Sequence, residues 1–124
     1  MKKLDHVGIV TDNLAKSLAF FEGSLGLRCT HQEELPERGI RVAFLPIGDT
    51  RIELIEPLHA NSEVSGFLAK RGPGVHHLAF ESESAPSKLE TIKPFELGAD
   101  GAQIAFVHPK KTGGVLVEVC VHES

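Results

Sequence analysis

The feature that most constrains how this chain can fold is an internal repeat. "DHVGIV" near the start matches "HHLAFE" in the middle, and "RIELIEP" matches "VLVEVCV" near the end. In this alignment His6 falls on His77, and Glu53 falls on Glu118. The glutamate follows its histidine by 47 residues in the first half and by 41 in the second, which indicates one module used twice.

The first module, about 1–58, reads as βαβββ. An apolar strand over 3–10 leads to a helix that Asp12 or Asn13 can cap and that Gly26 can end. Three strand-like runs follow, and the last two are joined by "IGDT", a sequence suited to a hairpin turn. A linker helix is expected next.

This linker helix, about 61–71, leads into the second module, about 74–122. Its pattern predicts a strand at "VHHLAFE", a short helix over "SAPSKLETIK" with Ser84 as its cap, and two strands around "KKTGG". From the histidine to the matched "VAF" or "IAF" run is 36 residues in the first half but 27 in the second. The second module is therefore shortened between Glu81 and Gln103, with one strand missing or compressed.

These patterns predict an α+β fold in which two βαβββ modules, related by pseudo-twofold symmetry, form one cupped mixed sheet. At 124 residues and 41% hydrophobic composition, the chain fits a single domain over 1–124. Cys29 and Cys120 lie in apolar strand patterns and are expected to be free thiols.

Charge and hydropathy exclude some partners. The net charge is −4 and the basic residues are scattered, so we expect no nucleic acid partner. No apolar run approaches the roughly 20 residues of a membrane span, and the first residues lack a signal-peptide pattern. We therefore expect a cytoplasmic protein that does not bind a membrane.

The repeat also predicts a metal site. Side chains alternate across a strand, and the odd-numbered positions from 115 to 121 are all valine, so Glu118 points away from that apolar face. Pseudo-twofold symmetry would then bring His6, Glu53, His77 and Glu118 to one concave surface. Two imidazoles and two carboxylates suit a divalent cation such as Co, Mn, Ni, Zn or Fe.

Each residue also has a simpler interpretation. A histidine in a strand is more often a core or surface residue than a ligand, and Glu53 could be the exposed half of an alternating strand. Only the symmetric placement of all four favours a metal. His76 is interpreted either as a structural residue or as one that contacts and orients a ligand without binding the metal. The remaining histidines carry no signal beyond composition: His31, His59, His108 and His122.

The same residues resemble a known family. "LDHVGIV", "SGFLAKRGPGVHHLAFE" and "IAFVHPKKTGGVLVEVC" are similar to the vicinal oxygen chelate superfamily (glyoxalase, bleomycin resistance protein and dioxygenase) and, within it, to the methylmalonyl-CoA epimerases. The resemblance spans nearly the whole chain. It implies metal ligands at His6, His77 and Glu118, and at Glu53, where the family has Gln or Glu.

The resemblance implies a function as well. It is metal-dependent epimerisation of methylmalonyl-CoA by proton abstraction alpha to the thioester, through an enolate, with Co, Mn, Ni or Zn as cofactor. Glu118 is the implied catalytic acid/base, an acyl-CoA is the implied substrate, and a homodimer is expected. Some relatives have a second acid/base in the strand after the "PERG" segment, but Val42 occupies that position here.

Other functions stay open at this point. The same four ligands would serve a glyoxalase-type isomerase or an iron-dependent dioxygenase on this scaffold, because a fold does not determine its chemistry. A non-catalytic protein that binds a small ligand is a third alternative. Four cationic side chains are candidates for contacts with coenzyme A phosphates: Lys70, Arg71, Lys110 and Lys111. Each of them could equally be an ordinary solvated residue.

Overall fold

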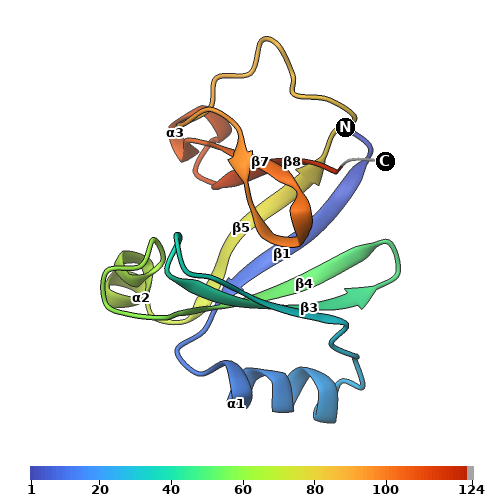
Figure 1. Cartoon of the computed structure of the whole chain (residues 1–124), viewed down its shortest axis with the longest axis vertical. Helices are drawn as coiled ribbons and strands as arrows, with labels where there is room; N and C mark the ends of the chain where they lie inside the picture. The colour runs from blue at the N-terminus through green and yellow to red at the C-terminus, as the bar shows by residue number, and fades with distance from the viewer. Residues whose placement is uncertain (123–124) are drawn as a thin grey trace.

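The computed structural model describes residues 1–122, which form one continuous mixed sheet of eight strands with short helices around it (Figure 1). The strands are β1 (Lys3–Val10), β2 (His31–Leu35), β3 (Ile40–Ile47), β4 (Thr50–Pro57), β5 (Gly74–Glu81), β6 (Glu96–Leu97), β7 (Gln103–Val107) and β8 (Val117–Val121). The helical segments are α1 (Leu14–Leu18), which continues as a π-helical turn η1 (Ala19–Ser24), α2 (Ser65–Arg71), the 3-10 turn η2 (Ala99–Gly101) and α3 (Pro109–Thr112).

The strand order shows the duplication directly. The order across the sheet is β2-β3-β4-β1-β5-β8-β7-β6, so each module contributes four strands in the same arrangement. The modules meet at the antiparallel pair of β1 and β5, and each of these strands pairs in parallel with the last strand of its own module. The predicted α+β fold of paired βαβββ modules is confirmed for the strands.

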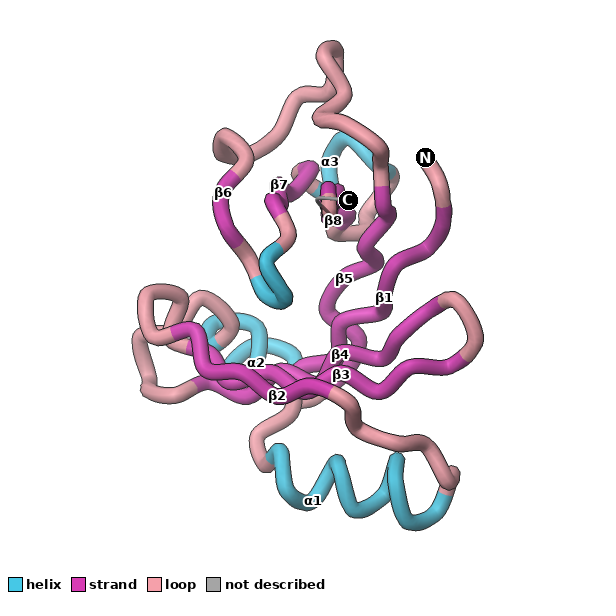
Figure 2. The backbone as a smooth tube through the Cα atoms, turned by 45° about the vertical axis from the view of Figure 1, so that its right-hand side comes forward, coloured by secondary structure: helices cyan, strands magenta, loops and turns pink. Residues whose placement is uncertain are grey.

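The sheet curls into a cup. Figure 2 shows the β2-β3-β4 arm and the β6-β7-β8 arm facing one another across β1 and β5. Contacts across the opening hold η2 against the first module. The backbone N–H of Asp100 donates to Oε1 of Glu33 at 3.0 Å, and the guanidinium of Arg51 contacts Oδ2 of Asp100 at 3.0 Å.

The first module has apolar packing on both faces of its sheet. On the convex face α1 and η1 cover a cluster that includes Ala43 and Leu54 (Figure 1). On the other face α2 packs against a cluster that includes Val42 and Phe44. As predicted, α1 is capped by Asn13, whose side chain accepts from the Lys16 N–H at 3.0 Å, a contact worth about 1 kcal/mol.

The second module lacks the expected helix over "SAPSKLETIK". The segment 82–95 has turns but no helix, so that prediction is wrong. The segment between Ser84 and Pro94 is long enough for only about two helical turns. A helix that short needs an apolar surface to pack against in order to be stable. The compressed strand is confirmed, because β6 has two residues.

Without that helix, the valine face of the last strand is only partly covered. Val119 is buried, whereas Val115, just before β8, is 44% exposed. Within residues 1–122, no helix has the length and apolar character that crossing a bilayer requires.

Candidate metal centre

The structure brings His6, Glu53, His77 and Glu118 together on the concave face, one from each of the four central strands. Each is at most 5% exposed. The strand register explains the convergence. Glu53 and His77 flank Gly8 on either side of β1, and His6 and Glu118 flank Ala79 on either side of β5.

The four side chains direct their polar atoms at one point. Nε2 of His6 lies 3.2 Å from Oε1 of Glu53 and 3.6 Å from Oε2 of Glu118. Nε2 of His77 lies 3.2 Å from Oε1 of Glu118 and 3.5 Å from Oε1 of Glu53, and the two Nε2 atoms are 3.3 Å apart. A cation held about 2.0–2.2 Å from each ligand atom requires roughly this spacing between them. The donor set therefore fits a divalent metal.

The electrostatics of the cluster favour charged groups. Burial alone would lower the pKa of His6, but hydrogen bonds to Asp5, Glu118 and Glu53 outweigh it and raise the pKa to about 11. Burial alone would raise the pKa values of Glu53 and Glu118. Their contacts with His6 and His77 outweigh this effect and hold both pKa values well below the usual range. Both carboxylates are ionised at neutral pH, as metal ligands need to be.

Asp5 holds the ring of His6 from behind. Nδ1 of His6 lies 2.6 Å from Oδ2 of Asp5, which directs Nε2 toward the other three residues. A register irregularity between Leu4 and His6 lets Asp5 and His6, although adjacent, both reach the interior.

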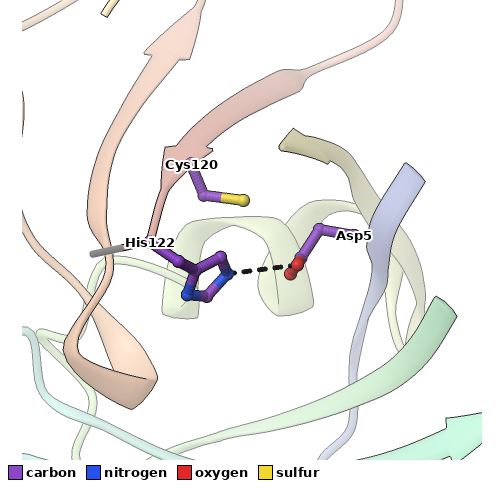
Figure 3. A group of neighbouring side chains, drawn as sticks. All are labelled: Asp5, Cys120 and His122. Carbon is purple, nitrogen blue, oxygen red and sulfur yellow. Dashed lines mark hydrogen bonds and ion pairs between the residues drawn. The ribbon is translucent and has the colours of Figure 1, made fainter. Parts of the chain in front are cut away.

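Asp5 is itself fixed by two partners. The Arg51 guanidinium donates to Oδ2 at 2.8 Å, and Nε2 of His122 lies 3.1 Å from Oδ1, a contact visible in Figure 3. The sequence interpretation missed Asp5 and took His122 as uninformative. The "DH" pair was the available signal for Asp5, whereas nothing local marks His122.

Asp5, His122 and Cys120 form a second group of possible ligand atoms, drawn in Figure 3. The charge of Arg51 on the Asp5 carboxylate disfavours a cation there. Burial and the nearby Asp5 carboxylate raise the pKa of Cys120 well above its usual range, so the group remains a thiol. Asp5 and His122 of this group therefore support His6, and the group fits a metal less well than the quartet does.

His76 supports His77 in an analogous way. The Nδ1 atoms of the two rings are 2.9 Å apart, and Phe67 packs edge-on against His76 with ring centroids 5.0 Å apart. Burial and the adjacent His77 lower the pKa of His76 to about 4, so it is a neutral acceptor at neutral pH. Nδ1–H of His77 therefore donates to His76, and Nε2 faces the cluster.

An open cleft of about 340 Å³ borders the cluster. It is lined by residues that include His76, Leu116 and Phe106. The Phe106 ring contacts His77 with centroids 5.5 Å apart, which places the cleft beside the ligand set. A second groove of about 500 Å³ is lined by both His76 and His77, with Lys70 and Arg71 among its other lining residues.

Paired modules around two histidines and two glutamates define a class of proteins. The chain belongs to the Glyoxalase/Bleomycin resistance protein/Dioxygenase superfamily, whose model matches residues 5–114. Its relatives narrow the class to the methylmalonyl-CoA epimerase family, a family of isomerases, which confirms the resemblance inferred from the sequence.

Two methylmalonyl-CoA epimerases support this assignment, and an uncharacterized protein is a further relative. The human mitochondrial methylmalonyl-CoA epimerase is 35% identical over 94% of this chain and 72% of its own. A variant of the Streptomyces coelicolor methylmalonyl-CoA epimerase, in complex with 2-nitronate-propionyl-CoA, is 30% identical with a TM-score of 0.93, over 100% of this chain and 99% of that one. The uncharacterized protein YqjC of Bacillus subtilis is 40% identical over 97% of this chain and 92% of its own.

Proposed function

We propose that this chain epimerises methylmalonyl-CoA in a metal-dependent reaction, at the carbon between the thioester and the carboxylate. The observation that carries the proposal is the buried quartet of His6, Glu53, His77 and Glu118, with its polar atoms 3.2–3.6 Å apart, in a chain of this family. These four residues would hold the cation. When bound, a divalent cation supplies charge stabilisation for the enolate that proton removal creates.

Glu118 is the proposed base. Its carboxylate is ionised in this site, and it borders the cleft through its strand partner Phe106. In the proposed step the C–H bond at C2 breaks, the proton moves to a Glu118 oxygen, and the electron pair moves toward the thioester oxygen. Return of a proton to the opposite face completes inversion. The group that supplies it is unassigned, because the fully buried Val42 has no proton to give.

The surrounding cleft suits an acyl-CoA. Apolar side chains such as Ile104, Phe106 and Leu116 line the 340 Å³ cleft, and His76 adds a polar group. Lys70 and Arg71 beside the 500 Å³ groove are candidates for contacts with coenzyme A phosphates. We also propose a homodimer in the cytoplasm, with Co, Mn, Ni or Zn as the native cation. Light scattering of the purified protein tests the oligomeric state.

Proton exchange at C2 tests the proposed function. Protein stripped of metal and then reloaded with cobalt or manganese is incubated with methylmalonyl-CoA in heavy water, and deuterium uptake and configuration at C2 are measured. We expect metal-dependent exchange with inversion, reduced at least a hundredfold by Glu118→Gln. Glu90→Gln, an exposed glutamate paired with Lys111, is the control and should exchange normally.

The outcomes separate the alternatives. No exchange with any metal would overturn the proposal and favour the binding protein. Turnover of a glutathione hemithioacetal in place of methylmalonyl-CoA would favour the glyoxalase-type isomerase. Iron-dependent oxygen consumption would favour the dioxygenase.

A further inference from the structure

Arg38, in the turn between β2 and β3, places a guanidinium beside the candidate metal centre. Its side chain is only 17% exposed and forms an ion pair with Glu63, which precedes α2. Arg38 lines the same small cavity as His6, Glu53 and Glu118. Its position and charge do not follow from the repeat, because the matched segment of the second module is compressed.

Arg38 has an unused donor. Within residues 1–122, its Nε is the one buried side-chain nitrogen or oxygen without a hydrogen-bond partner. A buried charged donor left unpaired is costly, and proteins rarely retain one unless a ligand or an ordered molecule satisfies it. The unpaired Nε–H of Arg38 therefore indicates that a hydrogen-bond acceptor enters the cavity.

The Arg38–Glu63 ion pair joins a residue that lines one cavity to a residue that lines another. Arg38 lines the cavity of the metal centre, whereas Glu63 lines the 340 Å³ cleft that also contains His76 and Phe106. Ile104 lines both cavities, so an acyl group that extends from the cleft toward the candidate metal centre would come close to this pair. Glu63 holds one end of the guanidinium and leaves Nε free to contact that group.

Charge balance favours an anion as the acceptor. Two ionised carboxylates, Glu53 and Glu118, neutralise a divalent cation between them. A substrate carboxylate adds one negative charge, and transfer of the C2 proton to Glu118 shifts a second negative charge from that glutamate onto the substrate. A guanidinium, which remains charged and matches the geometry of a carboxylate, compensates for this.

We propose that Arg38 binds the free carboxylate of the acyl group and so selects acyl-CoA substrates that carry one. The inference rests on the proposed function and assigns a substrate contact to a residue of this chain. Because a carboxylate has two oxygens, contact of one with Arg38 leaves the other available to the cation. Acyl-CoA molecules without this carboxylate lose the contact.

A difference between two ligands tests the proposal. Calorimetry of the cobalt-loaded protein measures the affinity for methylmalonyl-CoA and for propionyl-CoA, which lacks the carboxylate, and steady-state assays measure KM. Arg38→Gln should weaken methylmalonyl-CoA binding at least tenfold and raise KM, while propionyl-CoA affinity stays within about twofold. Arg38→Lys should restore part of the loss. Arg41→Gln, which removes a more exposed arginine paired with Glu34 and Glu56, is the matched control.

Two results would overturn the inference. One is an equal loss of affinity for both ligands, which would make Arg38 a structural residue only, and the other is no loss for either. If Arg38→Gln does not fold, Glu63→Gln releases the guanidinium and should still weaken methylmalonyl-CoA binding selectively. If the unmodified protein neither binds nor epimerises methylmalonyl-CoA, the proposed function itself fails. Failure of the Arg38 inference alone leaves that activity intact.

Discussion

The imidazole of His77 lies directly over the backbone of Gly8. A Cβ on Gly8 would lie 2.1 Å from Cε1 and 2.4 Å from Nδ1 of His77, well inside contact distance. Gly8 also separates Glu53 from His77 across the sheet. The absence of a side chain at position 8 is therefore a condition for the observed position of His77 in the candidate metal centre.

Gly8→Ala should displace the His77 ring and weaken cobalt binding at least tenfold, because the ligand atom can no longer reach its position. Competition with a chelator measures the affinity, and thermal unfolding checks that the fold is retained. Gly23→Ala is the control, since a Cβ there has no neighbour within 4 Å. Unchanged cobalt affinity in Gly8→Ala would show that His77 is not a ligand.

Asp5→Asn tests the support of His6. We expect cobalt affinity to fall by about 10–100-fold, because the amide orients the ring less strongly and makes Nε2 less basic. The absorption spectrum of bound cobalt should also shift. Asp12→Asn, an exposed aspartate in the same segment, should leave both measurements unchanged. A loss of affinity in both variants would contradict a specific role for Asp5.

Metal binding should release protons. Without metal, the pKa of His6 is raised to about 11 and that of His77 is also raised, so the site is protonated at neutral pH. A cation displaces those protons, and cobalt affinity should therefore increase with pH. Calorimetry at pH 7.5 in buffers of different ionisation enthalpy measures the number released, which we expect to be at least one. A value of zero would contradict the assignment of His6.

Titration of His6, Glu53 and Glu118 also makes the stability of the metal-free protein depend on pH. Raising the pKa of His6 above 6.5 contributes stability that is fully present below pH 6.5 and is lost as pH rises toward about 11. The depressed pKa values of Glu53 and Glu118 contribute stability above pH 4.5 that is lost as pH falls further. The cluster therefore stabilises the metal-free fold most between these values. Urea unfolding at pH 5.5 and 9 should show a lower free energy of unfolding at pH 9, and this difference should shrink in His6→Asn.

The segment 82–95 should exchange its amide hydrogens faster than α1. Few backbone hydrogen bonds hold it, among them Ile92 N–H to the Phe106 carbonyl at 2.8 Å, whereas α1 packs on the sheet. Hydrogen exchange followed by mass spectrometry compares the two segments within the same sample. Equal protection would mean that the segment is more stably packed than its contacts indicate.

Much of this architecture could be predicted from the sequence because its signals are local. Alternating apolar residues indicate strands, and Asn13 and Gly26 mark the ends of the first helical segment. The repeat matched His6 with His77 and Glu53 with Glu118. Local signals also misled, because a cap and two prolines suggest a helix over "SAPSKLETIK" that has too few residues to pack.

Tertiary structure alone decided the environment of the site. Strand register placed Gly8 beneath His77, an irregularity in β1 turned Asp5 inward, and the curl of the sheet brought His122 to Asp5. These contacts join residues up to 117 positions apart in the chain. A residue's own neighbours in sequence determine its strand or helix propensity, but its distant partners depend on how whole strands pair and twist. For that reason the sequence by itself identified the four candidate ligands, and only the fold revealed what orients them and the buried donor of Arg38 beside them.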